Sequence, residues 1–421
     1  VTLAGKIALK IDPNILHDLA SQVREKIFVV CGTNGKTTTN NLLCSAIESE
    51  GKKLVCNHTG SNMLDGVAAA FVLAAKNNGK LDADYASIEI DEASTVRVFP
   101  HFRPNYMVLT NLFRDQLDRY GEIDITMKLL DRAMKMAPEM KVIVNGDDAL
   151  SAYLAMESGN AYVTYGIPEQ VFDRQETGEI REGRFCKRCG ERLSYDFYHY
   201  SQLGSYHCPK CGFARPEADF AAEAIDMTHG LRFEVREKQS GEVTPIAVNY
   251  QGFYNIYNIL AAYSAARTGG LALTRFEKVL QEFNPQNGRM EHFTIGNTEV
   301  VLNLAKNPAG FNQNISAVME DDKEKDIIIV INDNAQDGTD ISWLWDVDFD
   351  RFADPSIHSI TVSGIRCQDM RLRMKYVDIP CQLENDVETA IKKRVQDGCG
   401  SLYVLVNYTA LFSTRGILAK M

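Results

Sequence analysis

The sequence predicts an α/β protein whose first and larger domain carries a phosphate-binding loop on a parallel sheet. Three observations lead to this prediction. Short apolar runs alternate with helix-length amphipathic segments, a glycine-rich turn follows the first run, and a second alternation starts after about residue 290. A chain of 421 residues has room for about two to four domains of roughly 100–200 residues each. We expect a first domain at residues 1–290 and a smaller Rossmann-like α/β domain at residues 291–421.

The expected strands are short runs rich in branched and aromatic residues. In the first domain they are Lys26–Val30, Lys53–Cys56, Tyr85–Ile90, Tyr106–Thr110, Lys141–Val144 and Ala161–Tyr165. In the second they are Val300–Leu304, Asp326–Ile331, Ser359–Val362 and Leu402–Val406. Helix-length segments separate most of them, which favours parallel sheets with helices on both faces.

The alternation breaks near Pro168. Residues from about 169 to 225 are rich in charge and aromatic side chains and contain four paired cysteines, so we expect an inserted module there. A hairpin-like stretch follows at 231–250, and a helix through Asn258 to Ala266 returns to the first domain.

Composition limits the classes of function. The formal net charge of −11 makes the whole chain a poor ligand for nucleic acid, so any anion site must be local. No run of about 18 apolar residues is present, so no membrane-spanning segment is expected. Most of the ten cysteines are scattered, which favours reduced thiols and a cytoplasmic location.

The glycine-rich turn has the composition of a phosphate-binding loop. It reads Gly32-Thr33-Asn34-Gly35-Lys36-Thr37-Thr38, between a strand and a helix. Glycines allow successive backbone N–H groups and the helix N-terminus to face an anion. Lys36 can reach the outer phosphates of ATP, and the Thr37 hydroxyl suits Mg²⁺. The common form of this motif has a further glycine where this chain has Val30.

The four cysteines of the insert have the spacing of a zinc ribbon. Two C-x-x-C pairs, Cys186/Cys189 and Cys208/Cys211, stand eighteen residues apart, and a glycine follows each pair. Four thiolates can hold one tetrahedral Zn²⁺, and a site filled entirely by protein is structural. The alternatives are a disulfide pair or an iron–sulfur site. The flanking Lys187 and Arg188 also allow a nucleic-acid-binding ribbon, which the acidic chain disfavours.

The loop sequence G-T-N-G-K-T-T resembles that of the Mur ligase superfamily, and further matches follow in the family's order. Glu89, in Tyr85–Ser94, stands where the family has a Mg²⁺-binding glutamate, although Asp91 or Glu92 could take that role. The other matches are Thr110–Asp118, Asn145–Asp148, Asn255 at the adenine-contacting position, and Arg289 at the position of a phosphate-contacting hinge arginine.

The resemblance implies an ATP-dependent carbon–nitrogen ligase that activates a carboxylate as an acyl phosphate. Lys36 and Glu89 would carry the catalytic chemistry together with Mg²⁺. Some members use a carbamylated lysine, but the spacing of Lys128 from Asp118 does not fit that role and we do not assign it.

The second domain narrows the resemblance. The runs Asn303–Gly310 and Asn332–Asp346, with the four-cysteine insert, resemble the ligase subunits of glutamine-hydrolysing lipid II isoglutaminyl synthases. That resemblance implies amidation of the α-carboxylate of D-glutamate in lipid II at the inner face of the plasma membrane. Ammonia would come from a separate GatD-type glutaminase, and Asp340 would complete that partner's Cys–His pair. The alternative reading of Asp340 is a helix-capping residue.

Two further features bear on this reading. Because 25 residues precede the first strand in this sequence, we expect no uridine-binding domain of the kind found in ligases that use UDP-linked precursors. Cys399 follows a helix-like run and precedes a strand, so we expect a turn residue rather than a glutaminase nucleophile. The alternative function is an amino-acid-adding ligase such as a folylpolyglutamate-synthase relative.

Overall fold

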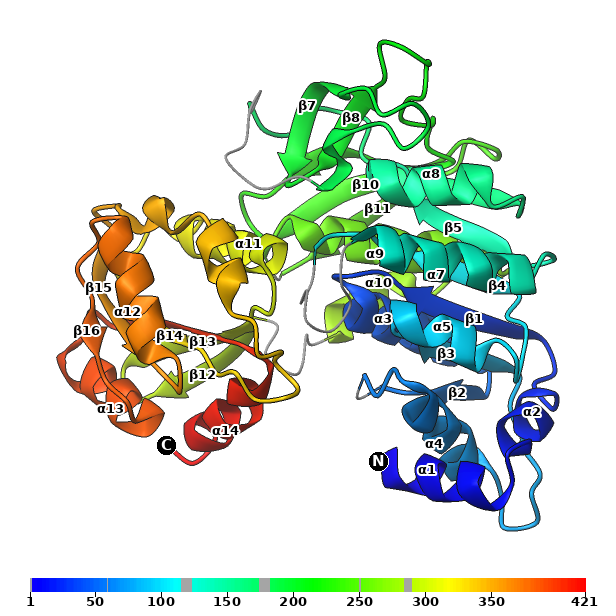
Figure 1. Cartoon of the computed structure of the whole chain (residues 1–421), viewed down its shortest axis with the longest axis horizontal. Coiled ribbons are helices and arrows are strands. Elements are labelled where there is room, and N and C mark those ends of the chain that lie inside the picture. The colour runs from blue at the N-terminus through cyan, green and yellow to red at the C-terminus, as the bar shows by residue number, and fades with distance from the viewer. Residues whose placement is uncertain (1, 59, 115–122, 174–181, 250, 284–289) are drawn as a thin grey trace. The chain divides into compact units, whose positions relative to one another are not determined.

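The computed structural model describes residues 2–58, 60–114, 123–173, 182–249, 251–283 and 290–421. They form two compact units, one built chiefly from residues 1–283 and the other chiefly from residues 284–421. Each unit has its own sheet and core (Figure 1).

The larger unit is organised around a nine-stranded sheet in the order β11-β10-β9-β6-β5-β4-β1-β3-β2. Its parallel part is β1 (Lys26–Cys31), β2 (Leu54–Cys56), β3 (Tyr85–Glu89), β4 (Tyr106–Leu109), β5 (Lys141–Asn145) and β6 (Tyr162–Gly166). These bounds agree with the six predicted strands to within one residue at each end. The sheet continues through β9 (Phe220–Asp226), β10 (Leu231–Glu237) and β11 (Val243–Val248), and β10 pairs antiparallel with both neighbours.

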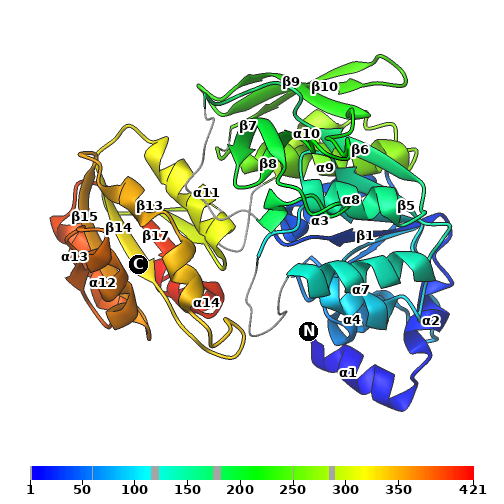
Figure 2. The same cartoon turned by 45° about the horizontal axis from the view of Figure 1, so that its top comes forward.

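Helices cover both faces of this sheet, as expected for parallel strands that are apolar on both sides (Figure 2). One face packs against α2 (Ile15–Ala20), α4 (Leu64–Ala74), α5 (Thr95–Val98), α7 (Ile123–Met136) and α8 (Ala149–Glu157). The other carries α3 (Lys36–Ser49), α9 (Tyr254–Thr268) and α10 (Phe276–Glu282). Helix α1 (Thr2–Ile11) packs on α4.

The cysteine-bearing insert forms a small two-stranded module. Its strands are β7 (Ser194–Tyr200) and β8 (Leu203–His207), which pair antiparallel. A small core containing Leu193, Tyr206 and Phe213 packs on Ala149 and Ala152 of α8. Because β9 belongs to the main sheet, the module ends before Phe220, earlier than the predicted boundary at about 225.

The smaller unit contains a six-stranded sheet in the order β12-β13-β17-β14-β15-β16. Its strands are β12 (Glu291–Ile295), β13 (Thr298–Leu304), β14 (Lys325–Val330), β15 (Ile357–Ser363), β16 (Gln382–Leu383) and β17 (Ser401–Val406), of which only the β12–β13 pair is antiparallel. Its helices are α11 (Pro308–Met319), α12 (Cys367–Tyr376), α13 (Val387–Asp397) and α14 (Tyr408–Leu418). Cys399 lies between α13 and β17, which confirms that it is a turn residue.

Candidate functional site

The predicted phosphate loop joins β1 to α3 and adopts a backbone that requires glycine. Gly32 has φ +122° and Gly35 has φ +83°, both in the region that side chains avoid. Gly35 is the N-cap residue of α3. A Cβ at Gly35 would also lie 2.2 Å from Oδ1 of Asn258 on α9. The loop is therefore pressed between the sheet and α9, with the N-terminus of a fourteen-residue helix behind it.

Thr110 and Asn111, which directly follow β4, hold the loop in this shape. The backbone carbonyl of Asn111 accepts a hydrogen bond from the Thr33 N–H at 2.8 Å, and its side-chain Oδ1 accepts from the Asn34 N–H at 2.9 Å. The Thr110 hydroxyl donates to the Asn34 carbonyl at 2.7 Å. These contacts give the T-N pair recognised in the sequence a physical role, which is to fix the loop that precedes α3.

Lys36 does not point freely into the loop. Its ammonium lies 3.0 Å from Oε1 of Glu92 and donates to the Gly32 carbonyl at 2.5 Å. The same Glu92 oxygen accepts from the Gly32 N–H at 2.8 Å. Lys36 and Glu92 are both 6% exposed, so the charge of each compensates the other in a dry environment. Glu92 thus positions the lysine beside the loop.

Thr37 and Glu89 meet at Gly60. A Cβ built on Gly60 would lie 3.5 Å from the Thr37 hydroxyl oxygen and 3.4 Å from Oε2 of Glu89. Asn62 donates to Glu89 Oε1 at 2.8 Å, whereas the buried Oε2 has no hydrogen-bond partner among the residues that the structure describes. A buried carboxylate oxygen without a donor is costly. A hydroxyl beside an unsatisfied carboxylate oxygen is a donor set that suits Mg²⁺.

Asn57 fixes the backbone of Glu89 from the preceding loop. Its Nδ2 donates to the Glu89 carbonyl at 2.8 Å, and its Oδ1 accepts from the Glu89 N–H at 2.8 Å. The glutamate at the end of β3 is therefore positioned by two asparagines of the 57–62 loop.

Asn255 lies in the first turn of α9 and is 4% exposed. Its Nδ2 donates to the Gln251 carbonyl at 2.9 Å, and its Oδ1 accepts from Asn258 at 3.1 Å. Since Asn258 is the residue that abuts Gly35, α9 connects the predicted adenine contact to the predicted phosphate loop.

The turn after β5 is a buried carboxylate pair. Asp147 accepts hydrogen bonds from Arg215 at 2.5 Å and from the Tyr257 hydroxyl at 2.7 Å. Burial raises the pKa of Asp148, although the Ser151 hydroxyl, the Gln202 amide and three backbone N–H groups donate to it. The pair joins β5 to the insert and to α9, which indicates a structural role.

In the smaller unit the acidic loop after β14 contains residues with different roles. Asp340 accepts from the N–H and hydroxyl of Ser342 at 2.8 and 3.0 Å, and it is half-buried. Asp337 is 4% exposed and binds the backbone and hydroxyl of Thr409. Asp333 pairs with Arg366 at 2.9 Å. Asp340 thus lies two residues before the short 3-10 helix Ser342–Asp346 and binds its first residue, whereas the N-cap residue of that helix is Ile341.

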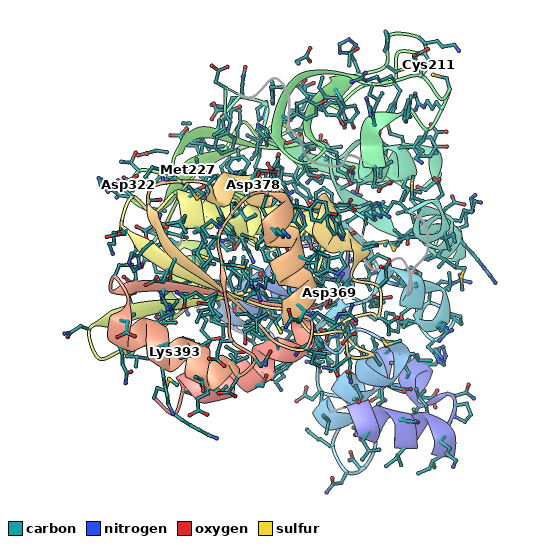
Figure 3. All side chains as sticks on the ribbon, turned by 60° about the vertical axis from the view of Figure 1, so that its left-hand side comes forward. Cys211, Met227, Asp322, Asp369, Asp378 and Lys393 are labelled. Carbon is teal, nitrogen blue, oxygen red and sulfur yellow. The ribbon has the colours of Figure 1, made fainter. Side chains whose placement is uncertain are left out.

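The four cysteines of the insert converge. The Cys186–Cys211 and Cys189–Cys208 sulfur pairs are each 3.5 Å apart, and all four sulfurs lie within 4.8 Å of one another. Gly190 and Gly212 have φ +75° and +73° and close the two turns. Cys211 lies at the exposed end of the module (Figure 3). The spacing fits tetrahedral thiolate coordination of one metal ion.

Several predicted residues cannot be placed. Arg289, Asp118 and Gln116 lie outside the residues that the structure describes. Among the placed residues, the structure brings together Thr33, Asn34, Gly35, Lys36, Thr37, Thr38 and Glu89 around the loop. Sequence reasoning missed Asn57, Asn62 and Gly60, and it considered Glu92 only as a substitute for Glu89. No motif marks these four roles, because each depends on a contact between distant segments.

No helix in the described part of the chain combines the length and apolarity that crossing a bilayer requires.

Comparison with known proteins agrees with this geometry. Residues 30–266 match the Mur ligase middle domain, and residues 304–411 match the MurT ligase C-terminal family. In structure the chain resembles a pseudomurein peptide ligase type C from Methanothermus fervidus, with TM-score 0.74, 21% identity, and coverage of 96% of this chain and 80% of that one. It also resembles the MurF ligase from Thermotoga maritima in complex with ADP, with TM-score 0.68, 12% identity, and coverage of 97% and 83%.

Two curated relatives are closer in sequence. A lipid II isoglutaminyl synthase (glutamine-hydrolyzing) subunit MurT from Staphylococcus aureus is 36% identical over 97% of this chain and 90% of the relative. The subunit of the same name from Streptococcus pneumoniae is 33% identical over 100% of this chain and 92% of the relative.

The phosphate loop on a parallel sheet, the Thr37–Glu89 pair and the family match define a Mur ligase-type, ATP-dependent enzyme. Within that class the chain belongs to the MurT family, because residues 304–411 match the MurT ligase C-terminal family and two MurT subunits are 33–36% identical over 97–100% of the chain.

Proposed function

We propose that this chain is the synthetase subunit of a glutamine-hydrolysing lipid II isoglutaminyl synthase. It would convert the α-carboxylate of D-glutamate in the lipid II stem peptide to the amide of D-isoglutamine. The observation that supports this most is 36% identity to a MurT subunit over 97% of the chain. Because that substrate is lipid-linked, the enzyme would act at the inner face of the plasma membrane.

The reaction consumes ATP and ammonia. A carboxylate oxygen attacks the γ-phosphorus of ATP, which gives an acyl phosphate and ADP. Ammonia then adds to the acyl carbon and phosphate leaves, so one amide forms for each ATP cleaved. The backbone N–H groups and the N-terminus of α3 would bind the phosphates, and Lys36 would neutralise their charge once it exchanges Glu92 for the nucleotide.

Mg²⁺ would bind at Thr37 and Glu89 and would compensate the charge that develops on the transferred phosphate. The unsatisfied Oε2 of Glu89 supports this assignment. Asn57 and Asn62 would hold the carboxylate in place when the metal is bound. Asn255 and Arg289 remain our candidates for contacts with the adenine and the phosphates.

Ammonia would come from a GatD-type glutaminase in a heterodimer with this chain. Asp340 is our candidate for the acid that orients the partner's histidine. Its hydrogen bonds to Ser342 hold it at a defined point of the loop, whereas Asp337 is buried against Thr409. We therefore prefer Asp340 to Asp337 for a contact made outside this chain.

We also propose that Cys186, Cys189, Cys208 and Cys211 bind one structural Zn²⁺. The four sulfurs are close enough to coordinate a single ion, and the two glycine turns are those of zinc knuckles. Elemental analysis should give at least one zinc per chain, and removal of zinc should unfold the module. Intact thiols without metal would refute the ribbon.

An amino-acid-adding ligase is the second candidate. Ligases named for L-alanine, L-lysine or diaminopimelate addition are 23–24% identical to this chain over about 70–72% of its length. This similarity is weaker and shorter than that to the MurT subunits. An ATP-dependent product that carries an added residue, rather than an amide, would favour this candidate.

Single substitutions test the proposed synthetase site. Thr37→Ala and Glu89→Ala should each abolish ATP-dependent amidation by the complex while glutamine hydrolysis persists. The matched control is Glu48→Gln, which changes an exposed carboxylate on the same helix as Thr37. Normal amidation by both alanine variants would remove the assigned Mg²⁺ site.

A further inference from the structure

A second cluster of metal-binding side chains lies beside the nucleotide site and takes no part in the proposed reaction. Cys44 on α3, Cys56 at the end of β2 and His58 in the following loop bring their ligand atoms within 4.8 Å of one another. The Cys56 sulfur is 3.5 Å from Nδ1 of His58. Two sulfurs and one imidazole nitrogen are ligands that zinc and similar soft divalent ions prefer.

The surroundings of Cys56 favour a thiolate. Asn40 Nδ2 approaches the Cys56 sulfur at 3.4 Å, and Oδ1 of Asn40 accepts a hydrogen bond from the Ser87 hydroxyl at 2.7 Å. Asn40 and Ser87 are fully buried, so the amide is fixed in orientation. Hydrogen bonds from outer groups to ligand atoms are typical of built metal sites.

The three ligand residues differ in burial, and this difference determines how accessible a bound metal ion would be to solvent. Cys44 is buried, Cys56 is half-buried and His58 is exposed. A metal held by these three residues would keep one coordination position open to solvent. Its affinity should therefore be lower than that of the four-cysteine module, and the ion should exchange more readily.

The loop that carries Cys56 and His58 is the one that positions Glu89. Asn57, between the two ligands, makes two hydrogen bonds to the Glu89 backbone, and Asn62 binds its carboxylate. A metal bridging Cys44 to this loop would tie α3, which carries Thr37, to the segment that holds Glu89.

We propose that Cys44, Cys56 and His58 form a second, exchangeable site for zinc or a similar soft divalent ion, next to the proposed Mg²⁺ site. Two thiolates and a neutral imidazole would make the occupied site electrically neutral. The site does not depend on the identity of the substrate or of the ammonia donor.

Metal counting tests this proposal with the full-length chain. After equilibration with excess Zn²⁺ and removal of free metal, we expect about two zinc ions per chain, one from each cysteine cluster. His58→Ala and Cys56→Ser should each lower the count to about one. His58 is exposed, so its replacement should not affect folding. Cys381→Ser, at a half-buried cysteine outside both clusters, is the matched control and should retain two.

Cobalt gives an independent readout. Co²⁺ titration should show two classes of thiolate–cobalt absorption, and only the weaker class should disappear in His58→Ala. An unchanged count in both variants, or a count of one in the unsubstituted reduced protein, would overturn the proposal. A Cys44–Cys56 disulfide found by mass mapping of protein kept under reducing conditions would also overturn it.

Helix α1 carries a separate, unexplained surface. Leu3, Ile7 and Ile11 recur every four residues and are 67%, 50% and 79% exposed. On another side of the helix, Gly5 packs so closely on α4 that a Cβ there would lie 1.9 Å from the Asp65 carbonyl oxygen. The aliphatic stripe is thus held facing away from α4.

The charges next to the stripe suggest what it contacts. Lys6 and Lys10 are exposed along it, and α1 contains no acidic residue. A basic amphipathic helix of this kind binds the surface of an anionic bilayer. We infer that α1 is a membrane-surface contact, a role that rests on the lipid-linked substrate of the proposed function.

Vesicle sedimentation without lipid II separates this inference from the ligase assignment. The protein should bind phosphatidylglycerol vesicles, and Leu3→Glu/Ile7→Glu/Ile11→Glu should bind at least about tenfold more weakly. The control, Ile125→Glu, changes a 49%-exposed aliphatic residue on α7 and should bind normally. Absence of binding by the unsubstituted protein, or equal binding by the triple variant, would overturn the inference. So would a solution dimer that the triple substitution dissociates.

Discussion

We predict that Glu89→Gln has opposite effects on two quantities: it should raise the free energy of unfolding of the free protein and weaken the binding of Mg·ATP. Oε2 of Glu89 is buried, and within the described part of the chain no donor reaches it. An unsatisfied buried acceptor costs about 1–3 kcal/mol, and more when it is charged. Glu89→Gln removes the charge and keeps an oxygen for Asn62. The free variant should therefore be more stable than the unsubstituted protein by about 1–2 kcal/mol.

Binding of Mg·ATP should act in the opposite direction, because it stabilises the unsubstituted protein more than the variant. At a Mg·ATP concentration 100 times Kd, the unsubstituted protein gains about 2.7 kcal/mol of stability. If the variant binds about tenfold more weakly, its gain at the same concentration is about 1.4 kcal/mol. The greater stability that the variant has without ligand should therefore decrease, in the presence of Mg·ATP, by the difference between these two gains.

Thermal unfolding with and without Mg·ATP measures both quantities. A stability change of 1 kcal/mol corresponds to roughly 2–4 °C in Tm for a unit of this size. Glu48→Gln should leave both Tm values unchanged. A free Glu89→Gln protein that melts below the unsubstituted one, or that gains as much from Mg·ATP, would refute the assignment of Glu89 as a metal ligand.

Three further predictions follow from single contacts. Gly35→Ala should lower the free energy of unfolding by more than the roughly 1–2 kcal/mol that a left-handed alanine costs, and it should weaken ATP binding, because its Cβ would lie 2.2 Å from Asn258. The control is Gly51→Ala, at φ +75° with no neighbouring atom within 4 Å, which should show only the backbone cost when unfolding by denaturant is measured. Asp147→Asn should lower the free energy of unfolding by about 3–5 kcal/mol, because Arg215 would lose its buried partner. The control Asp131→Asn, which loses a solvent-accessible pair with Lys135, should cost under about 0.5 kcal/mol. In metal-free protein, burial raises the pKa of Cys56, but hydrogen bonds with Cys44 and His58 outweigh burial and bring the pKa to about 7. The rate of alkylation at Cys56 should therefore rise with pH through about 7. If His58→Ala left the midpoint of this pH dependence unchanged, the hydrogen bond with His58 would not be a cause of the lowered pKa.

The sequence was sufficient for the strands and the loop because their signals are local. Apolar runs such as Lys141–Asn145 and the glycines of the phosphate loop fix backbone conformation over a few residues, and the structure follows them closely. The hairpin of β10 and β11 and the turn at Cys399 were predicted on the same basis.

The contacts around the loop could not be predicted in the same way. Whether Glu89 or Glu92 faces Thr37 depends on a turn after β3 that directs one carboxylate to Gly60 and the other to Lys36. The insert was expected to extend to about residue 225, and only the pairing of β9 with β6, a contact between distant segments, assigns Phe220–Asp226 to the main sheet.

The most direct test of the proposed function is to combine this chain with a GatD-type glutaminase, lipid II, ATP and glutamine, and to follow the mass of the lipid-linked product. We expect the mass of an amide to replace that of a carboxyl group only when both ATP and glutamine are present, and we expect Thr37→Ala to abolish the change. Unchanged lipid II under the complete conditions, or a product that carries an added amino acid, would contradict the proposed function.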